Sequence, residues 1–203
     1  MNSSTTKKSL IVKTVALIGI MAALSSILRF LEFPLVFIAP GFLKFDLSNL
    51  PALIVSFVLG PFYGLIVVAV KNLVYLPATS TMGVGEIADF ILGGIFVFSS
   101  GLIYKFKQTK KMALIGMSAG TIITALTAAF LNYFLLIPFF AELFHLSLDE
   151  IVGAFKKVVP FIRNLFDAVL FSVVPFNILK GVVISAVTFF VYKRISSVFK
   201  KIK

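Results

Sequence analysis

The sequence predicts an all-α integral membrane protein with six transmembrane helices and both termini in the cytoplasm. Hydrophobic residues make up 60% of the 203 residues. The mean hydropathy of +1.09 is higher than a water-soluble domain of this size would carry. Lysine and arginine also gather in three places along the chain, and none of the eight acidic residues lies in these places.

The three basic clusters set the predicted orientation. The first cluster precedes or opens the first apolar segment, the second divides the chain near its middle, and the third closes its C-terminal end. Their members are Lys7, Lys8 and Lys13; Lys105, Lys107, Lys110 and Lys111; and Lys193, Arg194, Lys200, Lys201 and Lys203. Connections rich in lysine and arginine stay on the cytoplasmic side. An even number of crossings must therefore lie on each side of the central cluster, and four followed by two fits the apolar segments best.

The six predicted helices span residues 10–30, 50–59, 62–76, 87–104, 112–138 and 175–194. The second and third are shorter than the roughly 20 residues of an ordinary membrane span. Gly60 and Pro61 separate them with a pair that favours a turn, so we expect a tight hairpin packed against other helices. We expect one domain over residues 1–203, because no linker or repeat divides the chain.

The first external connection, residues 31–49, carries four phenylalanines and is more apolar than a solvated loop. Residues 43–47 alternate between apolar and charged side chains, which is the period of an extended strand. Leu43, Phe45 and Leu47 should therefore face one side. Two interpretations are equally open: a lid over an apolar ligand, or a loop that rests on lipid.

The second external connection, residues 141–174, contains a predicted amphipathic helix. Ser147 and Glu150 have the spacing of a capping box, and apolar residues then recur at helical spacing as far as Phe166. Such a helix lies at the membrane surface or covers the bundle. His145 is the only histidine and there is no cysteine, so we expect no metal site, which needs three or four ligands.

Polar side chains inside the predicted spans are the best candidates for a binding site, since they are costly in hydrocarbon and usually face an interior cavity. Gly116, Gly120, Thr124 and Ala128 recur every four residues, and such a stripe lets a neighbouring helix approach closely. Asn132 continues the stripe and should point into the outer half of the bundle.

Two lysines lie within predicted spans. Lys180 shares a helical face with Asn177; it either snorkels to the outer headgroups or belongs to a binding site, which the neighbouring asparagine favours. Lys71 is expected to form a structural ion pair with Glu86 or Asp89.

The first helix carries two pairs of small residues, Gly19 with Ala23 and Ala22 with Ser26. Such pairs serve a partner or packing within the chain. The sequence contains no phosphate-binding loop, HExxH or GxSxG motif. We therefore expect no catalytic residue and no cofactor, and uphill transport would have to draw on a partner or an ion gradient.

Four segments together resemble the riboflavin-binding S component of energy-coupling factor (ECF) transporters, the vitamin importers of bacteria. They are FLKFDLSNLPALI at 42–54, GPFYGLIVVAVKNLVYL at 60–76, TMGVGEIADFILG at 81–93 and PFNILKG at 175–181. The last, with Ser185 and YKRI at 192–195, is the most specific. The resemblance implies a multi-pass protein of the bacterial cell membrane that captures riboflavin outside. It would deliver riboflavin with a shared transmembrane subunit and two cytoplasmic ATPases.

The resemblance also implies the residues of the riboflavin site: Leu43, Phe45, Asp46, Leu47, Gly85, Glu86, Asp89, Asn132, Asn177 and Lys180. Asparagine offers the isoalloxazine ring both donors and an acceptor, whereas lysine offers donors only. One departure is Asp89, where the resemblance leads us to expect asparagine. The small residues of the first helix resemble the docking motif of S components: Gly19, Ala22, Ala23 and Ser26.

Two alternatives stay open at this point. One is an S component for another vitamin, such as thiamine or biotin. The other is an intramembrane enzyme that modifies a lipid with Asp46, Glu86 or Asp89 as metal ligands, against which the lack of a paired acidic motif argues. Binding of flavin mononucleotide is also left open. A nucleic acid partner is not expected, since the basic residues flank apolar spans.

Overall fold

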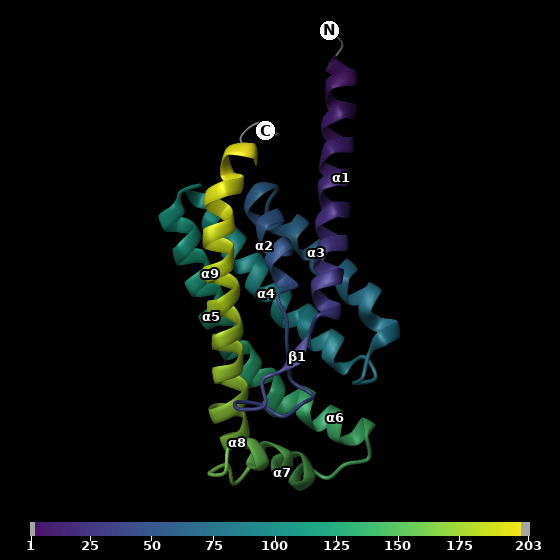
Figure 1. The fold of residues 1–203 in the computed structure, drawn as a ribbon, viewed down its shortest axis with the longest axis vertical. Coiled ribbons are helices and arrows are strands. Elements are labelled where there is room, and N and C mark those ends of the chain that lie inside the picture. The colour runs from purple at the N-terminus through teal and green to yellow at the C-terminus, as the bar shows by residue number, and fades with distance from the viewer. Residues whose placement is uncertain (1–2, 200–203) are drawn as a thin grey trace.

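The computed structural model describes the backbone of residues 3–199 and the side chains of residue 8 and residues 10–191. The fold over this range is a helical bundle (Figure 1). Its helices are α1 Ser3–Phe30, α2 Asn49–Val58, α3 Pro61–Tyr75, α4 Val84–Phe106, α5 Lys110–Leu131, α6 Ile137–Leu143, α7 Leu148–Val158, α8 Leu165–Ala168 and α9 Val174–Phe199. Shorter elements are the strands β1 Phe33–Pro34 and β2 Lys44–Phe45, the 3₁₀ turn η1 Leu76–Ala78, and the π-helical turns η2 Asn132–Leu136 and η3 Val169–Val173. Lys200, Lys201 and Lys203 lie outside the described residues, as do the side chains of Lys7, Lys193 and Arg194.

Five described helical segments are long and apolar enough to cross a membrane: Leu10–Phe30, Pro61–Ala78, Val84–Phe106, Lys110–Leu143 and Leu165–Val191. The predicted helical membrane fold is confirmed at this level. α2 is a shorter apolar helix, and every residue in it except Leu50 is buried. At its end Gly60 adopts a φ of 120°, and Pro61 opens α3, so the predicted tight hairpin is confirmed.

α4 and α5 pack closely along the predicted stripe of small residues. A Cβ added to Gly116 would lie 2.6 Å from the backbone oxygen of Ser100, and one added to Gly120 would lie 3.1 Å from that of Phe96. A Cβ does not fit at Gly116, because real Cβ atoms do not approach backbone so closely, and a Cβ at Gly120 would also clash with the hydroxyl oxygen of Ser100. Asn132, at the end of the stripe, is buried as predicted.

The structure corrects the ends of the last two predicted spans. The final helical segment begins at Leu165, not at Pro175, and the segment before it continues through Pro138 to Leu143. In each case a π-helical turn precedes the proline. The wider turn relieves the clash between a proline ring and the preceding carbonyl, which breaks a regular helix. The second external connection is therefore shorter than the predicted 141–174.

α7 covers the end of the bundle that lies opposite the N-terminus (Figure 1). The predicted capping box is confirmed: Ser147 accepts from the N–H of Glu150, and the Glu150 carboxylate accepts from the N–H of Ser147. The bonds that this carboxylate accepts from the N–H and the hydroxyl of Ser147 lower the pKa of Glu150. The apolar face packs against α6, α8 and η3 through Ile151, Val152 and Phe155. The predicted continuation to Phe166 is wrong, because α7 ends at Val158, two residues before Pro160.

The two small-residue pairs of α1 have different surroundings. Ala22 and Ser26 are buried within the chain, and Ser26 donates a hydrogen bond to the carbonyl of Ala22 at 2.9 Å. Gly19 and Ala23 are exposed on the other side of the helix. Ala22 and Ser26 therefore serve packing in this chain, and only Gly19 and Ala23 remain available to a partner.

Candidate functional site

A cavity lies among the C-terminal end of α1, the start of α4, and the helices α5 and α9. Six charged residues line it: Arg29, Glu32, Lys44, Glu86, Asp89 and Lys180. Amides and hydroxyls from Asn49, Ser80, Thr81 and Thr124 add uncharged polar groups, and Phe42, Leu92 and Phe176 add apolar surface. The cavity thus combines apolar walls with many polar groups.

The structure brings seven of the ten predicted site residues to this cavity: Leu43, Gly85, Glu86, Asp89, Asn132, Asn177 and Lys180. Phe45, Asp46 and Leu47 are not among the lining residues. Phe45 packs instead in an apolar cluster with Ala39 and Phe176, with Leu47 against it. The buried Asp46 does not line the cavity itself but forms ion pairs with the lining residues Arg29 and Lys180.

The first external connection folds over the cavity as a cover. β2 pairs antiparallel with β1, with Phe33 opposite Phe45 and Pro34 opposite Lys44, so the extended segment predicted for residues 43–47 is confirmed over Lys44 and Phe45. Phe42, Leu43 and Lys44 reach the cavity from this connection. Phe42 and Lys44 are not among the ten predicted site residues.

Phe42 joins the cover to the far end of the bundle. Its ring stacks on that of Phe140 at a centroid distance of 5.3 Å and meets the edge of Phe155 at 5.5 Å. Phe140 belongs to α6 and the buried Phe155 to α7. Two segments far apart in the sequence therefore meet at one residue of the cavity wall.

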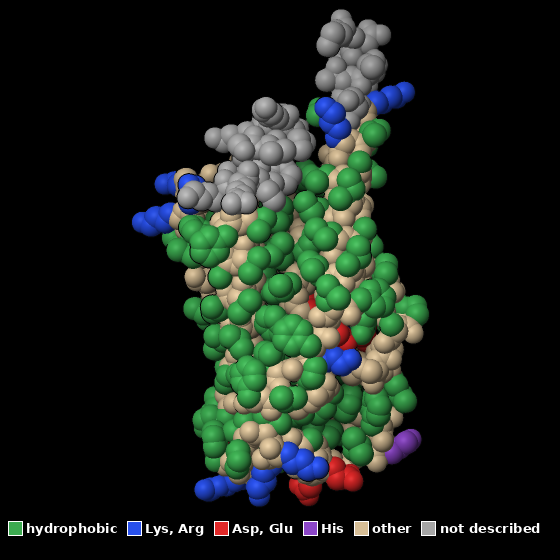
Figure 2. Space-filling model, in the orientation of Figure 1, with side chains coloured by type: hydrophobic (Ala, Val, Ile, Leu, Met, Phe, Trp, Pro, Cys, Tyr) green, Lys and Arg blue, Asp and Glu red, His purple; other side chains and the backbone are tan. Residues whose placement is uncertain are grey.

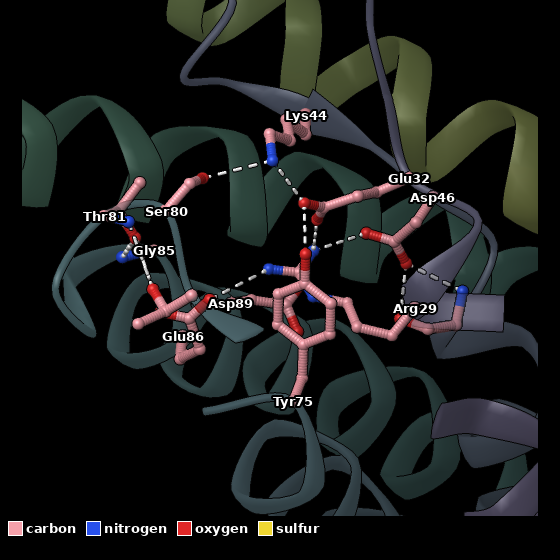
Figure 3. A network of polar contacts seen from close by, with 12 residues as sticks. Arg29, Glu32, Lys44, Asp46, Tyr75, Ser80, Thr81, Gly85, Glu86 and Asp89 are labelled. Carbon is pink, nitrogen blue, oxygen red and sulfur yellow. Dashed lines mark hydrogen bonds and ion pairs between the residues drawn. The ribbon is translucent and has the colours of Figure 1, made fainter. Parts of the chain in front are cut away.

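The charged side chains form one continuous network, part of which Figure 3 shows. Arg29 lies 3.1 Å from Glu32, 2.8 Å from Asp46 and 3.8 Å from Glu86. Glu32 also accepts from Lys44 at 2.6 Å. Arg29 and Glu32 were not predicted as site residues, although they stand three residues apart at the end of a helix, a spacing at which side chains meet.

Asp89 joins the network to α3 and α9. Its carboxylate lies 2.7 Å from Lys71 and 3.2 Å from Lys180, and Lys180 lies 2.9 Å from Asp46. The predicted ion pair of Lys71 is therefore confirmed, with Asp89 as its partner. Lys71 also donates to Ser48 and, at 2.8 Å, to the side-chain oxygen of Asn49, and it is fully buried.

The surroundings of Asp46 keep it ionised. Burial alone would raise its pKa, but the positive charges of Lys180, Lys71 and Arg29 outweigh burial and hold the pKa at about 2. Asp46 also accepts from the backbone N–H of Ser48 at 2.8 Å. At neutral pH this residue is an anion that positions the cations around the cavity.

The side chains of Asn132 and Asn177 are each held by the same kind of hydrogen bond to their own helix. Each donates a side-chain N–H to the carbonyl four residues earlier, that of Ala128 at 2.8 Å and that of Val173 at 2.9 Å. Both residues line the cavity, and this bond leaves the amide oxygen and a second N–H of each able to bond to a ligand. The buried hydroxyl of Thr124 has no partner among the described residues, so it too can bond to a ligand.

The site has the chemistry of a binding pocket. The described residues contain no group of three or more His, Cys, Asp or Glu side chains arranged to hold a metal ion. Aromatic and aliphatic walls suit a flat, largely apolar ring system. The amides, hydroxyls and ion-paired carboxylates suit the polar edge and hydroxyl groups of such a ligand.

A model of the family described as "ECF transporter, substrate-specific component" matches residues 13–192. The chain belongs to this family. The match confirms the predicted family and the prediction that the chain is a transport component, not an enzyme. With its apolar helices it is a multi-pass membrane protein.

Bacterial relatives cover most of this substrate-specific component. It is 33% identical over 190 residues to "Riboflavin transporter RibU" of Staphylococcus aureus (strain TCH60), covering 94% of each chain. It is 30% identical over 180 residues to "Riboflavin transporter FmnP" of Bacillus subtilis (strain 168), covering 87% of this chain and 88% of that relative. A solved structure titled "Structure and mechanism of the S component of a bacterial ECF transporter" superposes with a TM-score of 0.73 at 31% identity. It covers 93% of this chain and 98% of the other.

Proposed function

We propose that this chain is the riboflavin-binding S component of a bacterial ECF-type importer. It captures riboflavin at the outer face of the membrane and releases it inward when an ATPase-driven module acts on it. One observation carries the proposal: seven predicted riboflavin contacts, taken from four separate segments, line one covered cavity. The chain also belongs to the S component family, and its relatives are named riboflavin transporters.

The cavity offers complementary groups to each part of riboflavin. Phe42 and Phe176 supply flat apolar surface for the isoalloxazine ring. Asn132 and Asn177 offer acceptors to the ring imide N–H and donors to its carbonyl oxygens. The ribityl hydroxyls then lie toward the charged network, where Glu86 and its neighbours accept and donate hydrogen bonds.

The proposed topology has six crossings, with the buried α2 as the short one and both termini in the cytoplasm. The start of α1, the start of α5 and the end of α9 lie at one end of the bundle (Figure 1). Lys and Arg side chains lie at both ends in Figure 2, but at the α7 end Asp and Glu side chains accompany them, whereas the predicted basic clusters at the other end contain no acidic residue. By the positive-inside rule the cavity then opens to the outside. Residues 1–203 form a single domain in this proposal.

The proposed partners are a transmembrane coupling subunit and two cytoplasmic ATPases. Gly19 and Ala23 offer a docking surface on α1, because both are exposed and a Cβ added to Gly19 would touch nothing within 4 Å. Small residues at a helix surface let another membrane helix approach closely. Ala22 and Ser26 support this surface from inside the chain and do not contact the partner.

A titration of the purified full chain in detergent tests the ligand. Riboflavin fluorescence should be quenched in a saturable manner at one site per chain, and thiamine and biotin should not compete. Asn177→Ala removes an amide from the cavity wall and should weaken binding, whereas Lys107→Ala changes an exposed side chain at the end of α4 that does not line the cavity and serves as the control. A wild-type protein that leaves riboflavin fluorescence unchanged would refute the proposed ligand.

A further inference from the structure

The charged wall of the cavity carries no net charge. The cations Arg29, Lys44 and Lys180 line it together with the anions Glu32, Glu86 and Asp89. The two charged residues behind this wall, Lys71 and Asp46, also cancel. Each of these charges lies within 4 Å of an opposite one. An uncharged ligand therefore leaves the wall balanced, whereas an anion adds a charge that no lining cation is free to meet.

Glu32 pairs with two cations of the cavity wall, Lys44 on the cover and Arg29 at the end of α1. Its carboxylate lies 2.6 Å from the ammonium of Lys44 and 3.1 Å from the guanidinium of Arg29. It also accepts from the hydroxyl of Tyr75 at 2.6 Å. The Glu32 side chain is only 7% exposed, so water weakens these contacts little.

Lys44 is the cation best placed to meet a ligand group that enters from outside. Its side chain is 27% exposed, the largest value among the ion-paired side chains of the described residues. It lies on the cover and reaches the hydroxyl of Ser80 at 3.1 Å, which links the cover to the turn before α4 (Figure 3). With Glu32 bound to it, Lys44 has little capacity left for another anion.

Building on the proposed function, we propose that Glu32 is a specificity residue that favours uncharged riboflavin over its 5′-phosphate, flavin mononucleotide. By occupying Lys44 and Arg29, its carboxylate withholds the two cations that a phosphate at the ribityl end would need. It also repels that phosphate directly. Glu32 sets selectivity through charge and not through contact with the flavin ring.

The size of this effect follows from Coulomb's law. A phosphate monoester carries about −1.5 to −2 charges at neutral pH. A unit charge several ångströms away, at an effective dielectric constant of about 20, changes the binding of such a group by about tenfold or more. Riboflavin has no such group, so the same carboxylate changes its affinity much less.

The test compares both ligands on the full-length protein in detergent. Glu32→Gln keeps the side-chain shape and removes the charge, and we expect the ratio of the flavin mononucleotide Kd to the riboflavin Kd to fall about tenfold. Lys44→Gln removes the opposing charge, and the ratio should rise. Tyr75→Phe deletes a hydrogen bond to Glu32 without a change of charge, and the ratio should stay at the wild-type value.

The outcomes separate this inference from the proposed function. If the wild-type protein fails to bind riboflavin, the proposed function is wrong. If riboflavin binds normally and neither charge variant shifts the ratio, the role of Glu32 is wrong while the proposed function stands. Should Glu32→Gln fail to fold, Lys44→Gln decides alone, since a ratio that stays constant or falls contradicts the inference.

Discussion

The buried pair of Lys71 and Asp89 predicts a non-additive effect on stability. Lys71 has no exposed surface, and its ammonium lies 2.7 Å from the carboxylate of Asp89. Lys71→Met fills a similar space but leaves that carboxylate with one cation fewer. Removal of one member of a buried ion pair costs about 3–5 kcal/mol. Because Lys180 still neutralises Asp89 at 3.2 Å, we expect the free energy of unfolding to fall by about 3 kcal/mol, the lower end of this range.

The double variant Lys71→Met with Asp89→Asn restores the balance of charge. Each single variant leaves the buried network with one unbalanced charge, since one removes a cation and the other an anion. The double variant removes both, and a polar amide remains at position 89 to face Lys180. It should be more stable than Lys71→Met alone, with a coupling energy of about 1–3 kcal/mol between the two sites.

Thermal unfolding of the purified protein in detergent measures the effect. A change of 1 kcal/mol shifts the Tm of a chain of this size by about 2–4 °C, so Lys71→Met should lower the Tm by about 6–12 °C. Lys107→Met replaces an exposed lysine at the end of α4 and should leave the Tm unchanged. If the double variant loses as much as the two single variants combined, the two charges are not coupled and the reasoning fails.

Three further predictions use other parts of the structure. The pKa of Asp46 is lowered from 3.8 to about 2, so its ion pairs should stabilise the protein fully above about pH 4 and progressively less as the pH falls toward 2. In Asp46→Asn the Tm should therefore depend less on pH between these values than it does in the wild type. Phe42→Ala loses two aromatic contacts worth about 0.5–1.5 kcal/mol each, and riboflavin should dissociate several-fold faster in stopped-flow experiments, whereas Phe37→Ala, at a residue 70% exposed on the same connection, should not differ from wild type. Gly19→Leu should abolish riboflavin uptake by cells while binding persists; Gly116→Leu, which clashes with backbone, should instead prevent folding.

The parts of the fold that sequence analysis predicted are those encoded by local patterns. Apolar runs located the membrane helices, and the four-residue spacing of Gly116 and Gly120 indicated a close helix contact on α5, which the structure shows to be with α4. The capping box at Ser147 marked the start of α7. Each pattern depends on residues that are close in the chain, so a linear reading is sufficient.

The helix ends were missed for a physical reason. Pro138 and Pro175 lie inside continuous helical segments, because a π-helical turn comes before each of them. Proline is a sound signal for a helix boundary in general. Nothing local distinguishes a proline that ends a helix from one that a wider turn accommodates, since the turn is maintained by packing between segments.

The charged network shows the same limit and explains why a chain this apolar retains buried charges. Arg29, Asp46 and Lys180 come from three separate segments, and only the fold places each of the two cations within 3 Å of the Asp46 carboxylate. Asp46 lies on the cover, whereas both cations lie on helices of the bundle. Unpaired, each charge would destabilise the membrane protein by several kcal/mol. The ion pairs join Asp46 on the cover to cations on two helices of the bundle, so the same contacts that compensate these charges also hold the cover against the cavity.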